Sequence, residues 1–217
     1  MPAAHTSHQG STEPGRPPRS MQIAGLVLAA GGGSRFGRPK ASVEVGGRRL
    51  VDLAIESCVG AGLSPVVVVL GAVWLIPMPR ADGPADDAAE IWLVENTEWA
   101  TGLASSLRAG LAALRGGPDV DGVVITPVDT VSVGKEHLRR VCSALRDGAT
   151  AAVATYEGMP RTPVGLASRV LADVARTVAG DEGARTWLRA NPELVTDVEC
   201  ADLGSWIDID TPGDLPR

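Results

Sequence analysis

Aromatic side chains and lysine are scarce in this chain, and each shortage narrows the functions open to it. Phe, Trp and Tyr make up 3% of the 217 residues, so we do not expect the stacking surfaces that bind single-stranded nucleic acid. The formal net charge of −6 argues against a general nucleic-acid binder, although it leaves room for a local cationic pocket. The basic residues are almost all Arg, and the two lysines are Lys40 and Lys135.

Cysteine and long apolar runs are also limited. Cys58, Cys142 and Cys200 lie far apart and are odd in number, so they form no metal or disulfide pattern and fit a reducing cytoplasm. No apolar run approaches the length of a membrane span, and we expect no membrane partner. The length and the ordinary balance of 44% hydrophobic and 21% charged residues predict one sizeable domain.

Residues 1–20 differ in composition from the rest of the chain. They are rich in Pro, Gly, Ser, Thr and His, show no apolar periodicity, and contain no apolar segment of the kind found in secretory signals. We therefore predict a disordered tail at 1–20 and one folded domain at 21–217, whose activity is inferred below.

Short apolar, β-branched runs alternate with helical patterns from residue 22 onward. This alternation predicts an α/β fold in which one domain has a mostly parallel sheet with helices on both faces, as in Rossmann-like proteins. We expect a surface excursion at 73–90, a helix at 107–114 capped by Ser105 or Ser106, and a helix at 182–190 capped by Asp181. The predicted strands are Ile23–Leu28, Val66–Leu70, 91–94, 122–125, Ala151–Tyr156, Val195–Glu199 and 206–210.

A glycine-rich, cationic loop follows the first predicted strand. Gly31, Gly32 and Gly33 permit close approach of a ligand to backbone amides, and Arg35, Arg38 and Lys40 follow. This pattern indicates a phosphate site, although a plain glycine-rich turn with solvated arginines is the alternative. The loop lacks the Gly-Lys-Ser/Thr ending of a Walker motif and the spacing of the dinucleotide fingerprint. Almost all basic residues of the chain are arginines with a planar guanidinium, whereas Lys40 places a compact ammonium at the end of this loop.

Three aspartates near strand ends complete the candidate site. Asp129 follows the predicted strand at 122–125, at the edge where open α/β sheets bind ligands. Asp208 and Asp210 are two apart in a predicted strand and would project from the same face. Carboxylates beside phosphates suggest Mg²⁺ between them. The alternative for Asp129 is that it caps the turn that follows it. The alternative for Asp210 is that it caps a short helix that starts at Thr211-Pro212, in which case Asp208 would still be a metal ligand.

The stretch Leu-Ala-Ala-Gly-x-x-Ser-Arg-x-Gly-x-Pro-Lys at 28–40 resembles the signature loop of the MobA-like nucleotidyltransferases. Over most of 22–215 the order of motifs is similar to the molybdenum cofactor cytidylyltransferases within that group. The segments that carry this resemblance are 95–102 with 105–111, 180–185 and 208–212. These enzymes join a nucleoside monophosphate to the terminal phosphate of molybdopterin and release pyrophosphate.

The resemblance implies a role for each matching position. Arg35 and Lys40 would neutralise charge on the nucleotide phosphates, Asp129 and Asp210 would hold Mg²⁺, and Asp208 would assist them. Ser106 would lie near the base. The nucleotide would be held by the backbone of the loop at Ala29, Ala30, Gly31, Gly32, Gly33 and Ser34. Because the guanylyl branch usually has Ala-Gly where this chain has Ala29-Ala30, the resemblance favours CTP.

Two positions depart from the family pattern, and both belong to its acceptor side. Thr130-Val131 stands where the family usually has Gln or Met and then Pro, and Arg161-Thr162 stands where it usually has Gly-His. A related transferase that acts on a sugar phosphate or an alcohol phosphate is therefore an alternative. A second alternative is a non-catalytic nucleotide or cofactor chaperone that serves a molybdoenzyme partner.

Overall fold

The computed structural model describes residues 20–78, 89–204, 206 and 208–215. The predicted tail at 1–20 lies outside the described residues except for its last position, and so does most of the predicted excursion at 73–90. Between residues 20 and 215, the description covers all the elements that form the candidate site.

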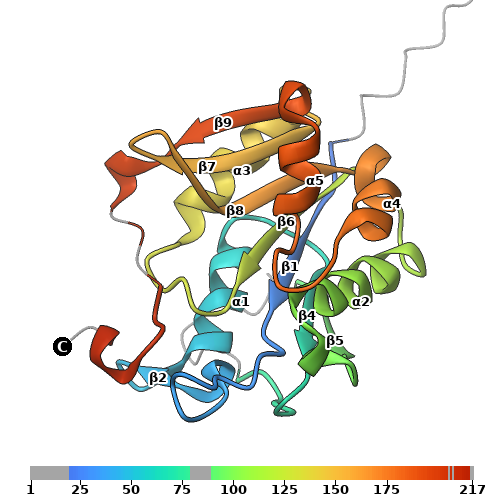
Figure 1. Ribbon diagram of the computed structural model, residues 1–217. Coiled ribbons are helices and arrows are strands. Elements are labelled where there is room, and N and C mark those ends of the chain that lie inside the picture. Colours follow the sequence, from blue (N-terminus) through green and yellow to red (C-terminus); the bar gives the residue numbers. More distant parts are fainter. Residues whose placement is uncertain (1–19, 79–88, 205, 207, 216–217) are drawn as a thin grey trace, which may run out of the picture.

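A seven-stranded sheet forms the centre of the molecule (Figure 1), in the order β5-β4-β1-β6-β8-β7-β9. All neighbouring pairs are parallel except those that involve β8, which runs antiparallel to β6 and to β7. The prediction of a mostly parallel α/β sheet is confirmed. The strands are β1 Ile23–Leu28, β4 Val66–Leu70, β5 Ile91–Glu95, β6 Gly122–Pro127, β7 Ala151–Tyr156, β8 Met159–Ala167 and β9 Val195–Glu199.

Helices cover both faces of the sheet and create two separate cores. On one face, α1 (Leu50–Gly60) and α3 (Lys135–Arg146) pack against the strands. On the other lie α2 (Leu103–Arg115), α4 (Ser168–Thr177) and α5 (Arg185–Ala190). β4 consists of four valines and a leucine, all fully buried, which is the pattern expected for a strand covered on both faces.

Short elements connect the sheet to the helices near the candidate site. A 3₁₀ turn at Lys40–Ser42 precedes a two-stranded hairpin of β2 (Glu44–Val45) and β3 (Arg48–Arg49). Gly46 and Gly47 form the hairpin turn with positive φ angles of 57° and 76°, which glycine adopts without strain. Further 3₁₀ turns are η2 Trp99–Thr101, η3 Pro192–Leu194, η4 Ala201–Leu203 and η5 Pro212–Asp214.

The predicted caps of two helices are wrong. Helix α2 begins at Leu103, so Ser105 and Ser106 lie within its first turn. Asp181 does not cap α5, which begins at Arg185; its carboxylate accepts a hydrogen bond from the amide of Leu103 at 3.2 Å. A residue 78 positions away along the chain therefore caps α2, a contact that local sequence does not reveal.

The predicted strand at 206–210 is also wrong. Residues 206 and 208–210 have no strand conformation, and residue 207 lies outside the described residues. The amide of Ile209 donates to the carbonyl of Asp129 at 3.0 Å, and the fully buried Ile209 side chain anchors the segment. One hydrogen bond to a loop places this segment beside β6 without extending the sheet.

Within the described part of the chain, no helix has the length and apolar character needed to cross a bilayer.

Candidate active site

A cleft of about 400 Å³ opens where β1 and β6 end. Because these strands are parallel, the loops that follow them meet at one edge of the sheet, and the beginning of α2 closes the third side. The residues that line the cleft are Leu28, Ala30, Gly31, Gly32, Gly33, Arg35, Lys40, Trp99, Ala100, Gly102, Leu103, Ser106, Pro127, Val128, Asp129, Asp181 and Asp210.

The glycine loop presents unused backbone donors to this cleft. The amide of Ala29 is occupied, because it donates to the carbonyl of Val69 at 2.9 Å. The amides of residues 30–34 donate to no acceptor within the described part of the chain. At Gly33, φ is 65° and a Cβ atom would lie 1.9 Å from the carbonyl oxygen of Arg38. The tight turn that exposes these amides therefore requires glycine.

Trp99 packs against the glycine loop from the side of α2. A Cβ atom at Gly32 would lie 2.9 Å from the Trp99 ring, and one at Gly71 would lie 2.6 Å from the Trp99 Cβ. Glycine at both positions lets the indole lie directly on the loops after β1 and β4. The ring is one wall of the cleft.

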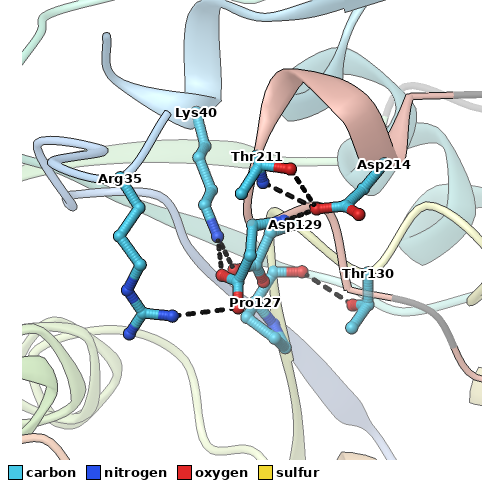
Figure 2. Close-up of polar contacts among 8 residues, drawn as sticks. Arg35, Lys40, Pro127, Asp129, Thr130, Thr211 and Asp214 are labelled. Carbon is cyan, nitrogen blue, oxygen red and sulfur yellow. Dashed lines mark hydrogen bonds and ion pairs between the residues drawn. The ribbon is translucent and has the colours of Figure 1, made fainter. Parts of the chain in front are cut away.

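Four charged side chains also line the cleft, and we call them the charged side: Arg35, Lys40, Asp129 and Asp210. The Lys40 ammonium donates to Asp129 Oδ2 at 2.8 Å and to Asp210 Oδ1 at 2.7 Å. Arg35 Nη1 donates to the other oxygen of Asp210 at 3.1 Å. Figure 2 shows Arg35 and Lys40 extending toward the carboxylates. The four charges come from three separate loops and balance one another.

Burial and pairing oppose each other at Lys40. Desolvation disfavours its charge, but hydrogen bonds from the ammonium to Asp129 and Asp210 outweigh this and raise the pKa of Lys40. The same contact lowers the pKa of Asp210, chiefly through the hydrogen bond from Lys40. At neutral pH the charged side therefore consists of an ammonium held between two carboxylates.

Asp208 lies behind this pair and does not line the cleft. Its Oδ1 atom is buried and, among the residues that the structure describes, has no hydrogen-bond partner. Burial, together with the negative charges of Asp129 and Asp210, raises the pKa of Asp208 to about 6. Asp208 and Asp210 therefore occupy different environments, contrary to the prediction that they project from one strand face. An unpartnered carboxylate beside two others is costly unless a cation or proton neutralises it.

Three uncharged side chains form a hydrogen-bonded group that we call the neutral side: Asn96, Ser105 and Ser106, of which Ser106 lines the cleft. All three are buried. Asn96 Oδ1 accepts from the amide of Glu98 at 3.0 Å, which fixes the amide orientation. Its Nδ2 then donates to Ser105 Oγ at 2.8 Å and to Ser106 Oγ at 3.0 Å.

The two serines differ in what remains for a ligand. Ser105 uses its hydroxyl proton within the chain, on the carbonyls of Glu98 or Gly102 at 3.0 and 2.8 Å. Ser106 accepts from Asn96, and within the described residues its own proton has no acceptor. Since Ser106 lines the cleft, it offers a hydrogen-bond donor there.

Most of the residues predicted from sequence meet in this cleft. Arg35, Lys40, Asp129, Asp210 and Ser106 line it, as do Ala30 and the three glycines. Ala29, Ser34 and Asp208 do not. Sequence reasoning missed Asn96, Trp99 and Asp181. Asn96 follows a strand and precedes a Trp and a Gly. This pattern indicates a site residue only when it is considered together with the glycine loop.

The carboxylates suit a divalent cation that is also held by phosphates. Within the described residues, no three acidic, His or Cys side chains form a ready-made metal cluster. Asp129 and Asp210 nevertheless share one cation, and Asp208 has an unpartnered oxygen beside them. Mg²⁺ commonly takes one or two carboxylates and completes its shell with water and substrate phosphate oxygens. The donor set fits that mode of binding.

The family model for the MobA-like NTP transferase domain matches residues 25–195. The chain belongs to the MobA-like NTP transferase family. The match spans the glycine loop, Lys40, the neutral side and Asp129, so most of the residues that line the cleft lie within the matched domain.

Curated relatives of this MobA-like protein have diverse names. Nicotine blue oxidoreductase of Paenarthrobacter nicotinovorans is 34% identical over 203 residues, which cover 90% of this chain and 95% of the relative. Purine catabolism protein PucB of Bacillus subtilis is 27% identical, with 89% and 94% coverage. A molybdenum cofactor guanylyltransferase of Rhizobium meliloti is 29% identical over 148 residues, with 66% and 62% coverage.

Solved structures share the fold of this chain. An Rv0371c homologue from Mycobacterium sp. strain JC1 aligns with a TM-score of 0.70 and 24% identity over 88% of this chain and 92% of its own. Rv0371c of Mycobacterium tuberculosis H37Rv, solved in complex with manganese, aligns with a TM-score of 0.64 and 26% identity, with 89% and 96% coverage. That related protein therefore takes a divalent metal.

Proposed function

We propose that this MobA-like protein is a Mg²⁺-dependent nucleotidyltransferase that transfers a nucleoside monophosphate, CMP from CTP, to a phosphate acceptor and releases pyrophosphate. The observation that carries the proposal is the Lys40 ammonium between Asp129 and Asp210, at the mouth of a loop with unused amides. A cationic group, a pair of carboxylates and free backbone donors are the parts that phosphoryl-group transfer requires.

The transfer needs positioning and charge stabilisation more than proton transfer. An anionic oxygen of the acceptor phosphate forms a bond to the α-phosphorus, and the bond from that phosphorus to the β-phosphate bridging oxygen breaks. The electron pair leaves with pyrophosphate. The glycine-loop amides and Arg35 hold the phosphates, and Lys40 stabilises the charge that develops at the α-phosphate. Bound Mg²⁺, held by Asp129 and Asp210, would supply further charge neutralisation.

The preference for CTP is supported by one sequence feature, and a donor on the neutral side suits a base in general. The sequence resemblance of Ala29-Ala30 favours the cytidylyl branch. Ser106 offers a hydroxyl donor on the neutral side, and carbonyl and ring-nitrogen acceptors on a base would meet it. Trp99 lines the same cleft and packs against the glycine loop.

The acceptor is proposed to be molybdopterin or another phosphate ester, with delivery to a molybdoenzyme in the former case. Two residues that depart from the family pattern have alternative uses in this chain. Thr130 turns inward and donates to the carbonyl of Pro127 at 3.1 Å, as Figure 2 shows. The Arg161 guanidinium stacks 4.3 Å from the centre of the Trp206 ring. An arginine near the sheet edge suits an anionic acceptor, including a sugar phosphate or an alcohol phosphate.

Pyrophosphate release tests the proposal directly. The purified protein would be incubated with Mg²⁺ and each NTP in turn, with molybdopterin, a sugar phosphate, an alcohol phosphate or no acceptor. Release that requires CTP and one acceptor supports the proposed transfer. Nucleotide binding without release from any combination would instead support a binding or chaperone role.

An oxidoreductase is a second candidate, because the relative with 34% identity across nearly the whole chain is named as one. The free amides of the glycine loop would suit the pyrophosphate of a nicotinamide dinucleotide as well as an NTP. Oxidation of NADPH with a conjugated dye or quinone as electron acceptor, without any need for an NTP, would favour this candidate.

A further inference from the structure

On the charged side, the Lys40 ammonium lies between the carboxylates where a metal-dependent transferase needs a metal ion. The Lys40 ammonium lies 2.8 Å from Asp129 and 2.7 Å from Asp210. Its side chain is 16% exposed, and that of Asp129 is 24% exposed. These contacts are short and partly shielded from water, so they are stronger than ordinary surface ion pairs.

A divalent ion and this ammonium compete for the same oxygens. Asp129 accepts from Lys40 through Oδ2, and Asp210 uses one oxygen for Lys40 and the other for Arg35. Two positive charges within a few ångströms repel strongly in a partly buried site. An ion that binds between the carboxylates must therefore displace Lys40.

We infer that Lys40 occupies the divalent-cation position of the ligand-free protein and moves to the nucleotide phosphates when the metal enters. The inference rests on the proposed function for the identity of the second partner, whereas the competition itself rests on the ion pairs alone. Without phosphates, a displaced Lys40 loses two charged hydrogen bonds and gains none. With phosphates present, it exchanges carboxylate oxygens for phosphate oxygens at little net cost.

This exchange has a consequence for the order of binding. The ligand-free protein binds a bare divalent ion weakly, and it binds the ion well only together with a nucleotide. The same contact keeps two neighbouring carboxylates neutralised until substrate arrives. Lys40 thereby acts both as an internal counter-ion and as a phosphate ligand.

The test measures binding of Mn²⁺ alone, with no nucleotide, from the paramagnetic resonance signal of the free ion. The variant Lys40→Met removes the competing ammonium, and Lys135→Met is the matched control because it removes the only other lysine, which is exposed on α3. We expect Lys40→Met to bind Mn²⁺ about tenfold more tightly than the wild type, equivalent to about 1.4 kcal/mol. Lys135→Met should match the wild type.

Two further variants make the result specific. The double variant Lys40→Met, Asp129→Asn should lose the gain, because one of the two ligands is missing. Lys40→Arg retains the positive charge and should bind Mn²⁺ as weakly as the wild type. Thermal unfolding gives an independent measure: Mn²⁺ should raise the midpoint of Lys40→Met more than that of the wild type. If Lys40→Met does not fold, Lys40→Gln replaces it.

Each outcome separates this inference from the proposed function. If Lys40→Met binds Mn²⁺ no more tightly than the wild type, the inference is wrong, even when pyrophosphate release from the wild type supports the transferase. If the gain appears but no NTP is turned over by the wild type, the competition between Lys40 and the metal stands and the proposed function fails.

Discussion

The neutral side and the charged side are built in different ways. The neutral side comes from a single stretch of 11 residues between β5 and the first turn of α2, and its members are at most 5% exposed. The charged side gathers Lys40, Asp129 and Asp210 from loops 89 and 170 residues distant from Lys40. Asp210 and Arg35 on that side are 46% and 75% exposed.

The contrast shows which part is ready for a ligand and which must change. On the neutral side, every hydrogen-bonding group of Asn96 is used, and a single Ser106 proton is left over. On the charged side, the cations and anions satisfy one another, so a ligand must exchange those contacts. We interpret the neutral side as a preformed recognition surface and the charged side as the part that rearranges during turnover.

The largest expected effect on turnover comes from removing the Lys40 charge from the charged side. Lys40→Met should reduce the rate of pyrophosphate release by about a hundredfold or more, because it removes a preorganised charge from the developing transition state. Pyrophosphate release at saturating nucleotide measures this effect. Lys135→Met should retain full turnover, and circular dichroism should show that both variants are folded. A Lys40→Met protein with wild-type turnover would contradict the role given to this side.

The second prediction concerns Trp99, which lines the cleft and packs against the glycine loop. Gly71→Ala would place a Cβ atom 2.6 Å from the Trp99 Cβ, so the chain must shift at a point where no flexible side-chain end can yield. We expect a loss of about 1–3 kcal/mol in unfolding free energy, measured with urea.

Gly31→Ala is the matched control for the same loop system. A Cβ atom at Gly31 meets nothing within 4 Å, so its unfolding free energy should stay within about 0.5 kcal/mol of the wild-type value. Equal destabilisation by the two substitutions would show that close packing on Trp99 does not set the geometry of the cleft.

The third prediction reverses the direction of hydrogen bonds on the neutral side. Asn96→Asp keeps the shape but replaces the amide donor with a carboxylate, which accepts from both serine hydroxyls. Ser106 would then spend its proton inside the protein. We expect the KM for the nucleotide to rise about tenfold with a much smaller change in kcat, since one ligand hydrogen bond is lost.

Steady-state kinetics with varied nucleotide would measure that change. Thr101→Ala serves as the control, because Thr101 is exposed and its hydroxyl bonds only to the Glu98 carbonyl at 2.8 Å. Its KM should equal that of the wild type. An unchanged KM in Asn96→Asp would mean that Ser106 does not donate to the nucleotide.

The smallest expected effect is a pH dependence that belongs to the charged side. The pKa of Asp208 in the folded protein is about 6, above its ordinary value of 3.8. Above pH 6 the ionised Asp208 carboxylate is less favourable in the folded state than in the unfolded state, so it lowers the free energy of unfolding. This destabilising contribution disappears as the pH falls from 6 toward 3.8. In the presence of a chelator, Asp208→Asn should raise Tm by about 2–4 °C at pH 7 and by little near pH 4.

Thermal unfolding across this pH range measures the difference. Asp197→Asn, on the exposed edge of β9, should leave Tm unchanged at every pH. A neutral-side variant such as Asn96→Ala should lose stability equally at pH 7 and pH 5. An Asp208→Asn protein that is no more stable than the wild type at pH 7 would remove Asp208 from the electrostatics of the site.

Local sequence predicted the sheet well but predicted the long-range contacts poorly. β1, β4, β7 and β9 have the predicted bounds, because runs of β-branched and other apolar residues between turns specify buried strands. The cap of α2 by Asp181 and the loop conformation at 208–210 were not predictable, because each depends on a partner far along the chain.

The candidate site was predicted in the same uneven way. The glycine loop and Asp129 were identified from residues that follow a strand directly, and both line the cleft. On the neutral side Ser106 was predicted from the family resemblance, whereas Asn96 and Ser105 were missed because they resemble an ordinary strand end and helix start. Their importance comes from burial and from the direction of their hydrogen bonds, which depend on the folded structure.

The reversal of β8 has an evolutionary consequence. Because β8 runs antiparallel to both β6 and β7, the turn at Glu157-Gly158 returns to the sheet edge at which β6 ends. The glycine loop and Lys40 belong to a different, parallel part of the sheet. Mutation and insertion in the hairpin can therefore change this edge of the sheet without disturbing the glycine loop. Such modularity would let one transferase scaffold give rise to descendants with very different chemistries.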